Sequence, residues 1–302
     1  MPNFSETENY VRELFSPNTS FSFEGKDYTI LETAKPRPES GECKTDVYVK
    51  LRDNEGACRE LKISVKQENA DFLENKIKYE RAKEILGDDV DCILTSSIEA
   101  IRKNFEQQYL VVFDKYGRTE ARTIKLGWKF ELLNIESGEL SGELALTSQQ
   151  VNDIYSGQNL PQDKKDAYVN GKVVKDSGVA DYILFVNDKK EYSLGDIVNS
   201  LIPIDKYVEE HPHIYYACKA LNYRADKDKW DGDRPLSVYV EWSLDNGILN
   251  GKLVFDEPLK KKGNEIGENL RNILREINIT KDNFGELKER LGTKVNYYVK
   301  EQ

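Results

Sequence analysis

GECKTDVYVKLRDNEGACRELKISVKQ, residues 41–67, carries the clearest structural signal in this chain. Apolar and charged residues alternate along two arms, which the turn-forming sequence Asp-Asn-Glu-Gly at residues 53–56 joins. This pattern predicts an antiparallel hairpin with strands at residues 46–51 and 59–66. Its outward positions would hold an acid at the start of the first arm and lysines near the end of the second. These charges either face solvent, or they hold a metal ion between the two arms.

The composition limits the classes of protein to which this chain can belong. The chain has 302 residues, of which 38% are hydrophobic and 32% are charged, and its formal net charge is −10. These values are typical of a soluble globular protein, and the negative total still allows a local basic groove for nucleic acid. The apolar runs are only as long as a strand and the first residues lack signal-peptide features, so we expect no membrane contact. Four cysteines without Cys-x-x-Cys spacing and only two histidines argue against structural zinc and favour a cytoplasmic protein.

The order of the predicted elements indicates an α+β fold. No Gly-rich phosphate loop or dinucleotide fingerprint is present, so we expect no organic cofactor. We predict a leading helix and strand unit at residues 1–35, a core at residues 36–190 and a β-rich C-terminal region at residues 191–302, unless the chain forms one domain. Beyond the hairpin, helices are expected at residues 6–14, 69–86, 148–155, 194–201, 204–221 and 267–277, and strands at residues 21–23, 28–31, 109–113, 122–133, 140–147, 167–174, 180–186, 236–243 and 248–255.

Carboxylates and a lysine on paired strands suit phosphoryl chemistry. Two carboxylates can hold Mg²⁺, and a lysine can position the attacking water or stabilise developing charge. Asp46 is the expected main metal ligand, and two assignments compete for its partners on the second arm. Glu60-Leu61-Lys62 is a literal acid-x-lysine element, whereas Ser64-Val65-Lys66 offers a second lysine on the same strand face. A turn centred near residues 54–55 places Asp46 opposite residues 62–64, from which Glu60 is distant and both lysines are close.

Glu80 is the candidate that would complete the site if Ser64 stands where a second acid is usual. Thirteen residues separate it from Lys66, and it follows Leu73 and Ile77 on the edge of the inward face of the helix predicted at residues 69–86. Asn69 or Asp71 would cap that helix. The metal ligands are therefore expected among Asp46, Glu60 and Glu80. An ordinary helix salt bridge is the competing interpretation for Glu80.

The hairpin resembles the core of the PD-(D/E)xK nucleases, the superfamily to which most type II restriction endonucleases belong. The likeness rests on Asp46 followed by Glu60-x-Lys62 or by Ser64-x-Lys66, on a hairpin that leads into a predicted helix. Some restriction enzymes use a Ser-x-Lys variant that a later glutamate completes, and the spacing of Glu80 matches that variant.

The resemblance covers roughly residues 36–115. It implies a restriction-endonuclease-like fold, in which helices flank a mixed central sheet, and Mg²⁺-dependent hydrolysis of DNA. The competing interpretation is an amphipathic sheet edge whose charges face water, since acid-x-lysine triplets are common in a chain this rich in charge.

A second segment, YRADKDKWDGDR at residues 223–234, mixes cationic and aromatic side chains in a predicted loop. Arginine can pair with guanine edges, lysine with phosphates, and tryptophan can stack on bases. A plain solvated loop is the alternative. The expected DNA-binding residues are Arg224, Lys227, Lys229, Trp230 and Arg234.

Together these features predict a Mg²⁺-dependent, sequence-specific endodeoxyribonuclease of type II restriction character. Its partner would be double-stranded DNA, and cutting both strands of a palindrome favours a homodimer. Its biological setting would be restriction-modification. Two alternatives stay open: a nuclease-like protein that binds nucleic acid without cutting, and a nuclease that acts on modified, branched or RNA substrates.

Overall fold

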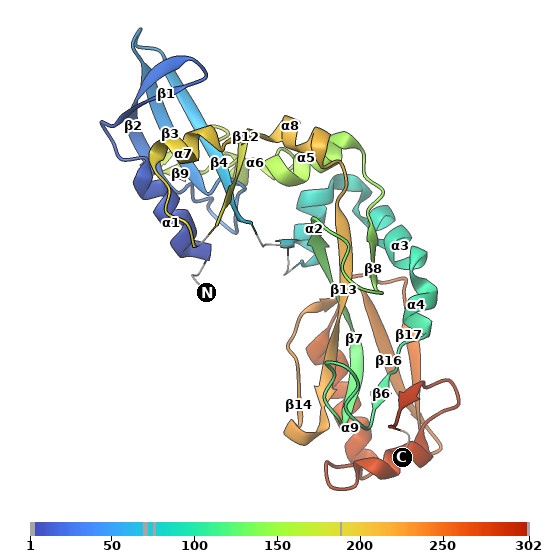
Figure 1. Cartoon of the computed structure of the whole chain (residues 1–302). Helices are drawn as coiled ribbons and strands as arrows, with labels where there is room; N and C mark the ends of the chain where they lie inside the picture. Colours follow the sequence, from blue (N-terminus) through green and yellow to red (C-terminus); the bar gives the residue numbers. More distant parts are fainter. Residues whose placement is uncertain (1–3, 69–71, 75–76, 188, 301–302) are drawn as a thin grey trace. The chain divides into compact units, whose positions relative to one another are not determined.

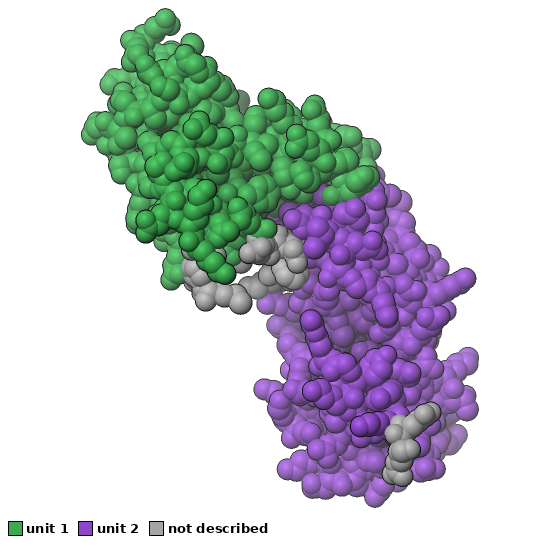
Figure 2. All heavy atoms as spheres, viewed as in Figure 1, with its two compact units in different colours: residues 1–71, 84–87, 146–213 green, residues 72–83, 88–145, 214–302 purple. Residues whose placement is uncertain are grey.

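A computed structural model describes residues 4–68, 72–74, 77–187 and 189–300 of the chain (Figure 1). It divides into two compact units, coloured in Figure 2. Unit 1 comprises residues 1–71, 84–87 and 146–213, and unit 2 comprises residues 72–83, 88–145 and 214–302. The boundaries expected at residues 35 and 190 do not coincide with these units, because the sheet of unit 1 is assembled from strands far apart in the sequence. The α+β class is confirmed, since helices and sheets occur in both units.

Unit 1 is built on a mixed sheet of six described strands in the order β1-β2-β3-β4-β11-β12. Neighbouring strands are antiparallel except β4 and β11, which are parallel. The expected leading strand pair is present as the first two strands of this sheet, so it does not form a separate unit. The strands are β1 (Ser20–Phe23), β2 (Lys26–Ala34), β3 (Val47–Asp53), β4 (Cys58–Gln67), β11 (Tyr182–Val186) and β12 (Ile202–Pro203).

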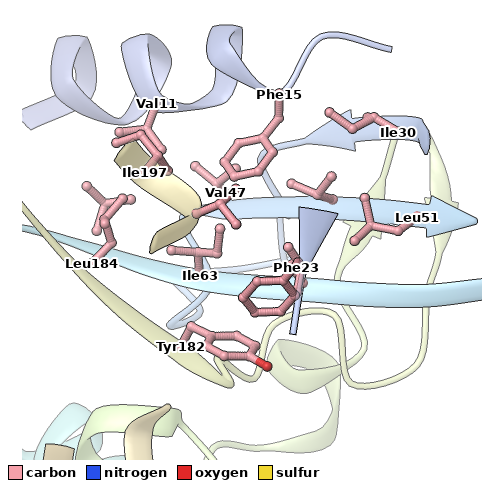
Figure 3. Packing of buried hydrophobic residues seen from close by; sticks show 14 of the residues in the cluster. Val11, Phe15, Phe23, Ile30, Val47, Leu51, Ile63, Tyr182, Leu184 and Ile197 are labelled. Carbon is pink, nitrogen blue, oxygen red and sulfur yellow. The ribbon is translucent and has the colours of Figure 1, made fainter. Parts of the chain in front are cut away.

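One face of this sheet packs against α1 (Phe4–Leu14) and α7 (Leu194–Asn199). Alternate residues of β3 and β4 point to this face, as strand geometry requires. Those that are buried there are Val47, Val49, Leu51, Leu61, Ile63 and Val65. Figure 3 shows Val11 of α1 and Phe15, which directly follows α1, directed toward Val47 and Ile63, with Ile197 of α7 beside them. Val11 and Phe15 are four residues apart, so both lie on the same side at the end of α1, which explains why this short segment docks on the sheet.

The opposite face of the sheet carries Tyr48, which packs with Ala34 and Val169. On the same face, α8 (Ile204–Glu210) contacts β11 through Tyr207, whose ring lies 5.4 Å from that of Phe185. Helix α5 (Ser148–Ser156) in turn contacts α8. Thr147 and Ser193 form capping boxes at the starts of α5 and α7. The remaining described elements of unit 1 are α6 (Gln162–Lys165), β9 (Tyr168–Val169) and β10 (Lys172–Val173).

The register of β3 against β4 follows from the turn between them. The side chain of Asp53 accepts hydrogen bonds from the backbone amides of Glu55 (3.0 Å) and Ala57 (2.8 Å). Val47 lies opposite Ile63, and Lys50 opposite Glu60. The sequence-predicted hairpin is therefore confirmed.

Unit 2 contains a second, larger sheet with the central path β14-β13-β7-β16-β17. Its long strands are antiparallel, and Trp128 at the centre of β7 is almost fully buried, with its ring 5.1 Å from that of Phe105. Helix α9 contacts β16, β7 and β13. The strands are β5 (Phe72–Glu74), β6 (Val111–Val112), β7 (Thr123–Leu133), β8 (Ser141–Glu143), β13 (Tyr215–Arg224), β14 (Lys229–Trp230), β15 (Pro235–Leu236), β16 (Val238–Asp245), β17 (Ile248–Val254), β18 (Lys261–Lys262) and β19 (Tyr297–Tyr298).

The helices of this part of the chain include two that the sequence pattern did not predict, α3 (Val90–Ala100) and α4 (Arg102–Glu106). The others are α2 (Tyr79–Leu86), whose last residues are counted in unit 1, α9 (Gly263–Glu276) and the short 3-10 segments at Gly87–Asp89, Ala225–Lys227 and Phe284–Arg290.

Two predicted helices are wrong in extent. In place of one helix over residues 69–86, Phe72–Glu74 pairs with β7 as a strand, and a helix begins only at Tyr79. The proposed caps Asn69 and Asp71 lie outside the described residues. The helix predicted at 204–221 ends at Glu210, because Tyr215–Arg224 forms a long ladder with β7. Pairing with a distant strand overrides the local helical pattern in both cases.

Within the described ranges, no helix combines the length and the apolar character needed to cross a membrane.

Lys125 is an unusual member of the unit 2 sheet, since its side chain is only 6% exposed. Its ammonium group has no hydrogen bond or ion pair among the described residues, and its closest aromatic contact is Trp128, at 5.9 Å from the ring centroid. Burial lowers the pKa of Lys125 to about 8. The charged form is therefore less favourable in the folded protein than in the unfolded chain, so this residue destabilises the fold below that pKa and ceases to do so at higher pH.

We predict that Lys125→Met raises the free energy of unfolding by about 2 kcal/mol at pH 7, because it removes a buried, unpaired charge. The gain should shrink as the pH is raised from 8 to 10, where Lys125 is already neutral in the folded protein. Urea unfolding of both proteins across this pH range measures the difference. A gain that does not change with pH would show that the side chain fills space poorly, with no contribution from its charge.

Candidate functional site

Asp46 lies immediately before β3, and two hydrogen bonds connect its side chain to β4. Its Oδ2 accepts a hydrogen bond from the backbone amide of Val65 (2.8 Å) and a longer one from Ser64 Oγ (3.4 Å). The amide of Asp46 donates to the carbonyl of Ile63 (2.9 Å). The side chain is half-buried, so these bonds hold the carboxylate at the start of one strand against the end of the next.

Lys66 shares the strand face of Ser64, since the two residues are two positions apart on β4. Within the described residues, its ammonium group makes no hydrogen bond or ion pair, and the side chain is half-buried. Burial raises the pKa of Asp46, and the positive charge of Lys66 acts in the opposite direction. The structure thus brings together Asp46, Ser64 and Lys66.

Glu8 and Lys35 belong to the same cluster, and the sequence patterns did not indicate either of them. Glu8 on α1 forms an ion pair with Lys35, which follows β2. Like charge on Glu8 contributes to the raised pKa of Asp46, and Lys35 partly offsets it. No sequence signal indicates this proximity, because the contact depends on how α1 docks on the sheet.

Two residues shortly before Asp46 bear on its surroundings, the half-buried Cys43 and the buried Thr45. Burial and the nearby charge of Asp46 raise the pKa of the Cys43 thiol to about 11, so this cysteine is a poor nucleophile at neutral pH. Its Sγ lies 3.5 Å from the carbonyl of Thr45. The hydroxyl of Thr45 is buried without a hydrogen-bond partner among the described residues.

Glu60 and Lys62, the literal acid-x-lysine pair, are engaged elsewhere. Glu60 accepts a hydrogen bond from the hydroxyl of Tyr48 (2.6 Å), and it lies opposite Lys50 rather than Asp46. Lys62 forms an ion pair with Asp181 (3.3 Å) and donates to the carbonyl of Asp176 (3.3 Å). These contacts tie Lys62 to the segment that precedes β11.

Glu80 lies in the first turn of α2 and belongs to unit 2, and its side chain is exposed. The expectation that it borders the inward face of a helix running from residue 69 is wrong, because that helix does not form. Glu80 is therefore not a residue of unit 1, which holds Asp46 and Lys66.

Asp46 and Glu8 are the carboxylates of this cluster that could hold a divalent cation. Both supply hard oxygen donors, and Mg²⁺ is commonly bound by one or two carboxylates together with water and substrate phosphate. Their repulsion, which contributes to the raised pKa of Asp46, would be relieved by a bound cation. This donor set fits Mg²⁺. Among the described residues, no three acidic, histidine or cysteine side chains are grouped so that they could share a metal ion.

The expected DNA-binding residues all lie in unit 2, around the end of β13 and β14. Arg224 forms ion pairs with Glu120 (2.5 Å) and Asp231 (2.6 Å), and Lys227 approaches the same Glu120 (3.5 Å). A phosphate would have to compete with these carboxylates. Lys229 is exposed and Arg234 is half-buried.

Trp230, the aromatic member of this group, is half-buried against α9. The guanidinium of Arg271 lies 4.5 Å from the centroid of its ring, and Gly267 approaches the ring so closely that a Cβ there would lie 2.8 Å from it. The indole therefore already has a cationic stacking partner within the fold.

Neither a protein-family model nor a curated protein nor a solved structure matches this chain.

Gly178 fixes the segment that leads into Asp46. Its carbonyl accepts hydrogen bonds from the amides of Lys44 (3.0 Å) and Thr45 (3.2 Å). A Cβ at this position would lie 2.1 Å from the carbonyl oxygen of Lys164 and 2.9 Å from the Cβ of Cys43. Only glycine allows this close approach, so residue 178 sets the position of the acid through the backbone.

We predict that Gly178→Ala lowers the free energy of unfolding by about 1–3 kcal/mol, because the new methyl group must displace backbone atoms. Urea unfolding measures this change. Gly195→Ala in α7 is the matched control, since its nearest contact would be 3.7 Å away, from Ser193 Oγ, and it should leave stability unchanged or slightly higher. Equal stabilities for the two variants would contradict the proposed packing.

Proposed function

We propose that the protein is a Mg²⁺-dependent endodeoxyribonuclease of the PD-(D/E)xK type, with its hydrolytic site at Asp46 and Lys66. The observation that carries this proposal is the bond from the Val65 amide to the Asp46 carboxylate. This bond joins the acid that directly precedes β3 to the residue directly before Lys66 on β4, as an acid and a lysine that share one phosphodiester would require.

The arrangement of unit 1 supports the same proposal. Its sheet is mixed, with α1 and α7 on one face and α8 packed on the other. A restriction-endonuclease-like fold places helices on both faces of a mixed sheet, and adjacent strands then supply the catalytic side chains. The two arms of the hairpin meet this requirement where β3 begins and β4 ends.

Each residue of the cluster has a distinct role in this proposal. Asp46 and Glu8 would hold Mg²⁺, which when bound polarises the phosphodiester and lowers the pKa of the attacking water. Ser64 and the Val65 amide orient the Asp46 carboxylate. Lys66 donates a hydrogen bond to the attacking water or to a phosphate oxygen on which negative charge develops.

The lysine of the site is then Lys66, and Lys62 acts as a structural residue. Lys62 is held by Asp181, a carboxyl whose pKa is raised by burial and lowered in part by this lysine. Glu60 is similarly held by Tyr48. We therefore assign the Ser64-x-Lys66 element to catalysis in preference to Glu60-x-Lys62.

The substrate and assembly that we propose are double-stranded DNA and a homodimer, with site-specific cutting of restriction type. Unit 2 would contribute to DNA recognition through Lys229 and Arg234. Arg224 would contribute as well if DNA replaced the two carboxylates with which it is paired. A symmetric dimer would place one hydrolytic site on each strand of a palindrome.

We predict that the protein converts supercoiled plasmid to linear or nicked DNA with Mg²⁺ and not with EDTA. Lys66→Ala should lower the rate about a hundredfold or more while the protein still folds and binds DNA. Lys62→Ala should keep most of the activity and instead lower the free energy of unfolding by about 1 kcal/mol, because Asp181 loses its partner. Gel assays and urea unfolding measure the two effects.

The alternative functions give other results in the same assay. Discrete fragments from phage DNA support site-specific cutting, whereas cleavage of RNA or of modified DNA alone would change the substrate class. DNA binding without cleavage under any divalent metal would overturn the enzyme proposal. Loss of cleavage in Lys62→Ala but not in Lys66→Ala would restore the Glu60-x-Lys62 assignment.

A further inference from the structure

A cavity of about 530 Å³ lies on the surface of unit 1, between the last turn of α1, the end of β2 and the hairpin of β9 and β10. Its volume is within the range of small-ligand sites. The lining side chains that matter for its chemistry are Arg12, Thr33, Lys35, Arg37, Tyr168 and Asn170.

Hydrogen bonds connect the segments that form the walls of this cavity. The segment after β2 and the β9 strand exchange two backbone hydrogen bonds, from Arg37 to the Tyr168 carbonyl (3.0 Å) and from Tyr168 to the Arg37 carbonyl (2.8 Å). Asn170 donates to Glu32 of β2 (2.8 Å), and Thr33 donates to the carbonyl of Phe15 (2.6 Å). The cavity is therefore held by bonds between segments distant in the sequence.

The charge of the cavity is one-sided. Among the described residues that line it, three are cationic and none is acidic. Lys35 is paired with Glu8, but the guanidinium groups of Arg12 and Arg37 form no hydrogen bond or ion pair within the described part of the chain. In a protein with a net charge of −10, two unpaired arginines beside a cavity favour an anionic ligand.

The cavity adjoins the cluster around Asp46 through two shared elements. Lys35 lines the cavity and pairs with Glu8, and the charges of Lys35 and Glu8 both act on the pKa of Asp46. Glu8 and Arg12 are also four residues apart on α1, so they lie one helical turn from each other on the same side. A strand of nucleic acid that reaches Asp46 would therefore meet the cavity next.

We infer that this cavity binds a backbone phosphodiester of the DNA, adjacent to the phosphodiester that lies at Asp46. Arg12 and Arg37 contact the phosphate oxygens, while the hydroxyl of Tyr168 and the amide of Asn170 contact phosphate or sugar. These contacts carry no sequence information and fix the position of the strand. The inference rests on the proposed function for its choice of DNA as the ligand.

The test is equilibrium binding of a fluorescein-labelled DNA duplex to the full chain in EDTA, measured by anisotropy over a range of salt concentrations. Arg12→Ala and Arg37→Ala should each weaken binding about tenfold and lower the slope of log affinity against log salt by about 0.9. Arg37→Lys should restore the slope, because it restores the charge. Arg52→Ala is the matched control, since Arg52 is an exposed arginine of β3 outside the cavity, and it should bind as the unchanged protein does.

Several results would overturn the inference. One is equal affinity and salt slope for Arg12→Ala, Arg37→Ala and Arg52→Ala, and another is no measurable duplex binding by the unchanged protein at low salt. If inorganic phosphate raises the melting temperature of the unchanged protein but not of Arg37→Ala, while duplex binding is unaffected, the cavity holds a free anion and the inference fails.

The cleavage assay separates this inference from the proposed function. Absence of cleavage with any metal, together with weakened duplex binding in Arg37→Ala, would sink the nuclease proposal and leave the cavity as a DNA contact. Normal cleavage with unaltered duplex binding in both arginine variants would support the nuclease proposal and would exclude the cavity as a DNA contact.

Discussion

The register between β3 and β4 is the constraint on which the site in unit 1 depends. The side chain of Asp53 closes the turn between these strands, and the ladder places Val47 opposite Ile63. Because side chains alternate along a strand, a shift of one residue would turn the whole buried set to the wrong face. The same register sets Asp46 against Ser64 and Val65, and sets Glu60 well away along the strand. The packing of the core and the grouping of the polar residues thus have one geometric origin.

The position of Asp46 works against the stability of the fold. Asp46 is held in a half-buried position where burial and the charge of Glu8 both raise its pKa. The hydrogen bond from Val65 and the charge of Lys66 offset this only in part. Residues chosen for stability alone would be apolar here, as they are on the opposite face of the same strands. The carboxylates at this end of the sheet are the residues on which the proposed function rests.

Much of the local structure could be predicted from the sequence, because its signals are short in range. The hairpin of β3 and β4, the amphipathic α1, the capped α7 and the hairpin of β16 and β17 follow from periodicity, turn residues and caps. The register that the turn predicts places both Lys62 and Lys66 close to Asp46 and does not choose between them.

What the sequence could not supply depends on contacts between distant segments. Tyr215–Arg224 becomes a strand because β7 provides a partner along its whole length, although its own pattern favoured a helix. Glu8 and Lys35 join the site because α1 docks on the sheet, and no motif links them to Asp46. The partition into two discontinuous units likewise appears only once the strands are paired.

The parallel pairing of β4 with β11 has a consequence for how the chain reaches its fold. Ile63 and Tyr182 are neighbours in the sheet, yet a large part of unit 2 is encoded between them. Pairing two strands that are so far apart in the sequence costs conformational entropy before their contact stabilises the chain, and such non-local pairing slows folding. During synthesis, α1 and the first four strands emerge well before β11 exists, which leaves the edge of β4 open for that interval. Strand β4, which carries Ser64 and Lys66, therefore gains its second neighbouring strand late in synthesis. Until then its unpaired edge is the part of this sheet that a chaperone would be expected to bind.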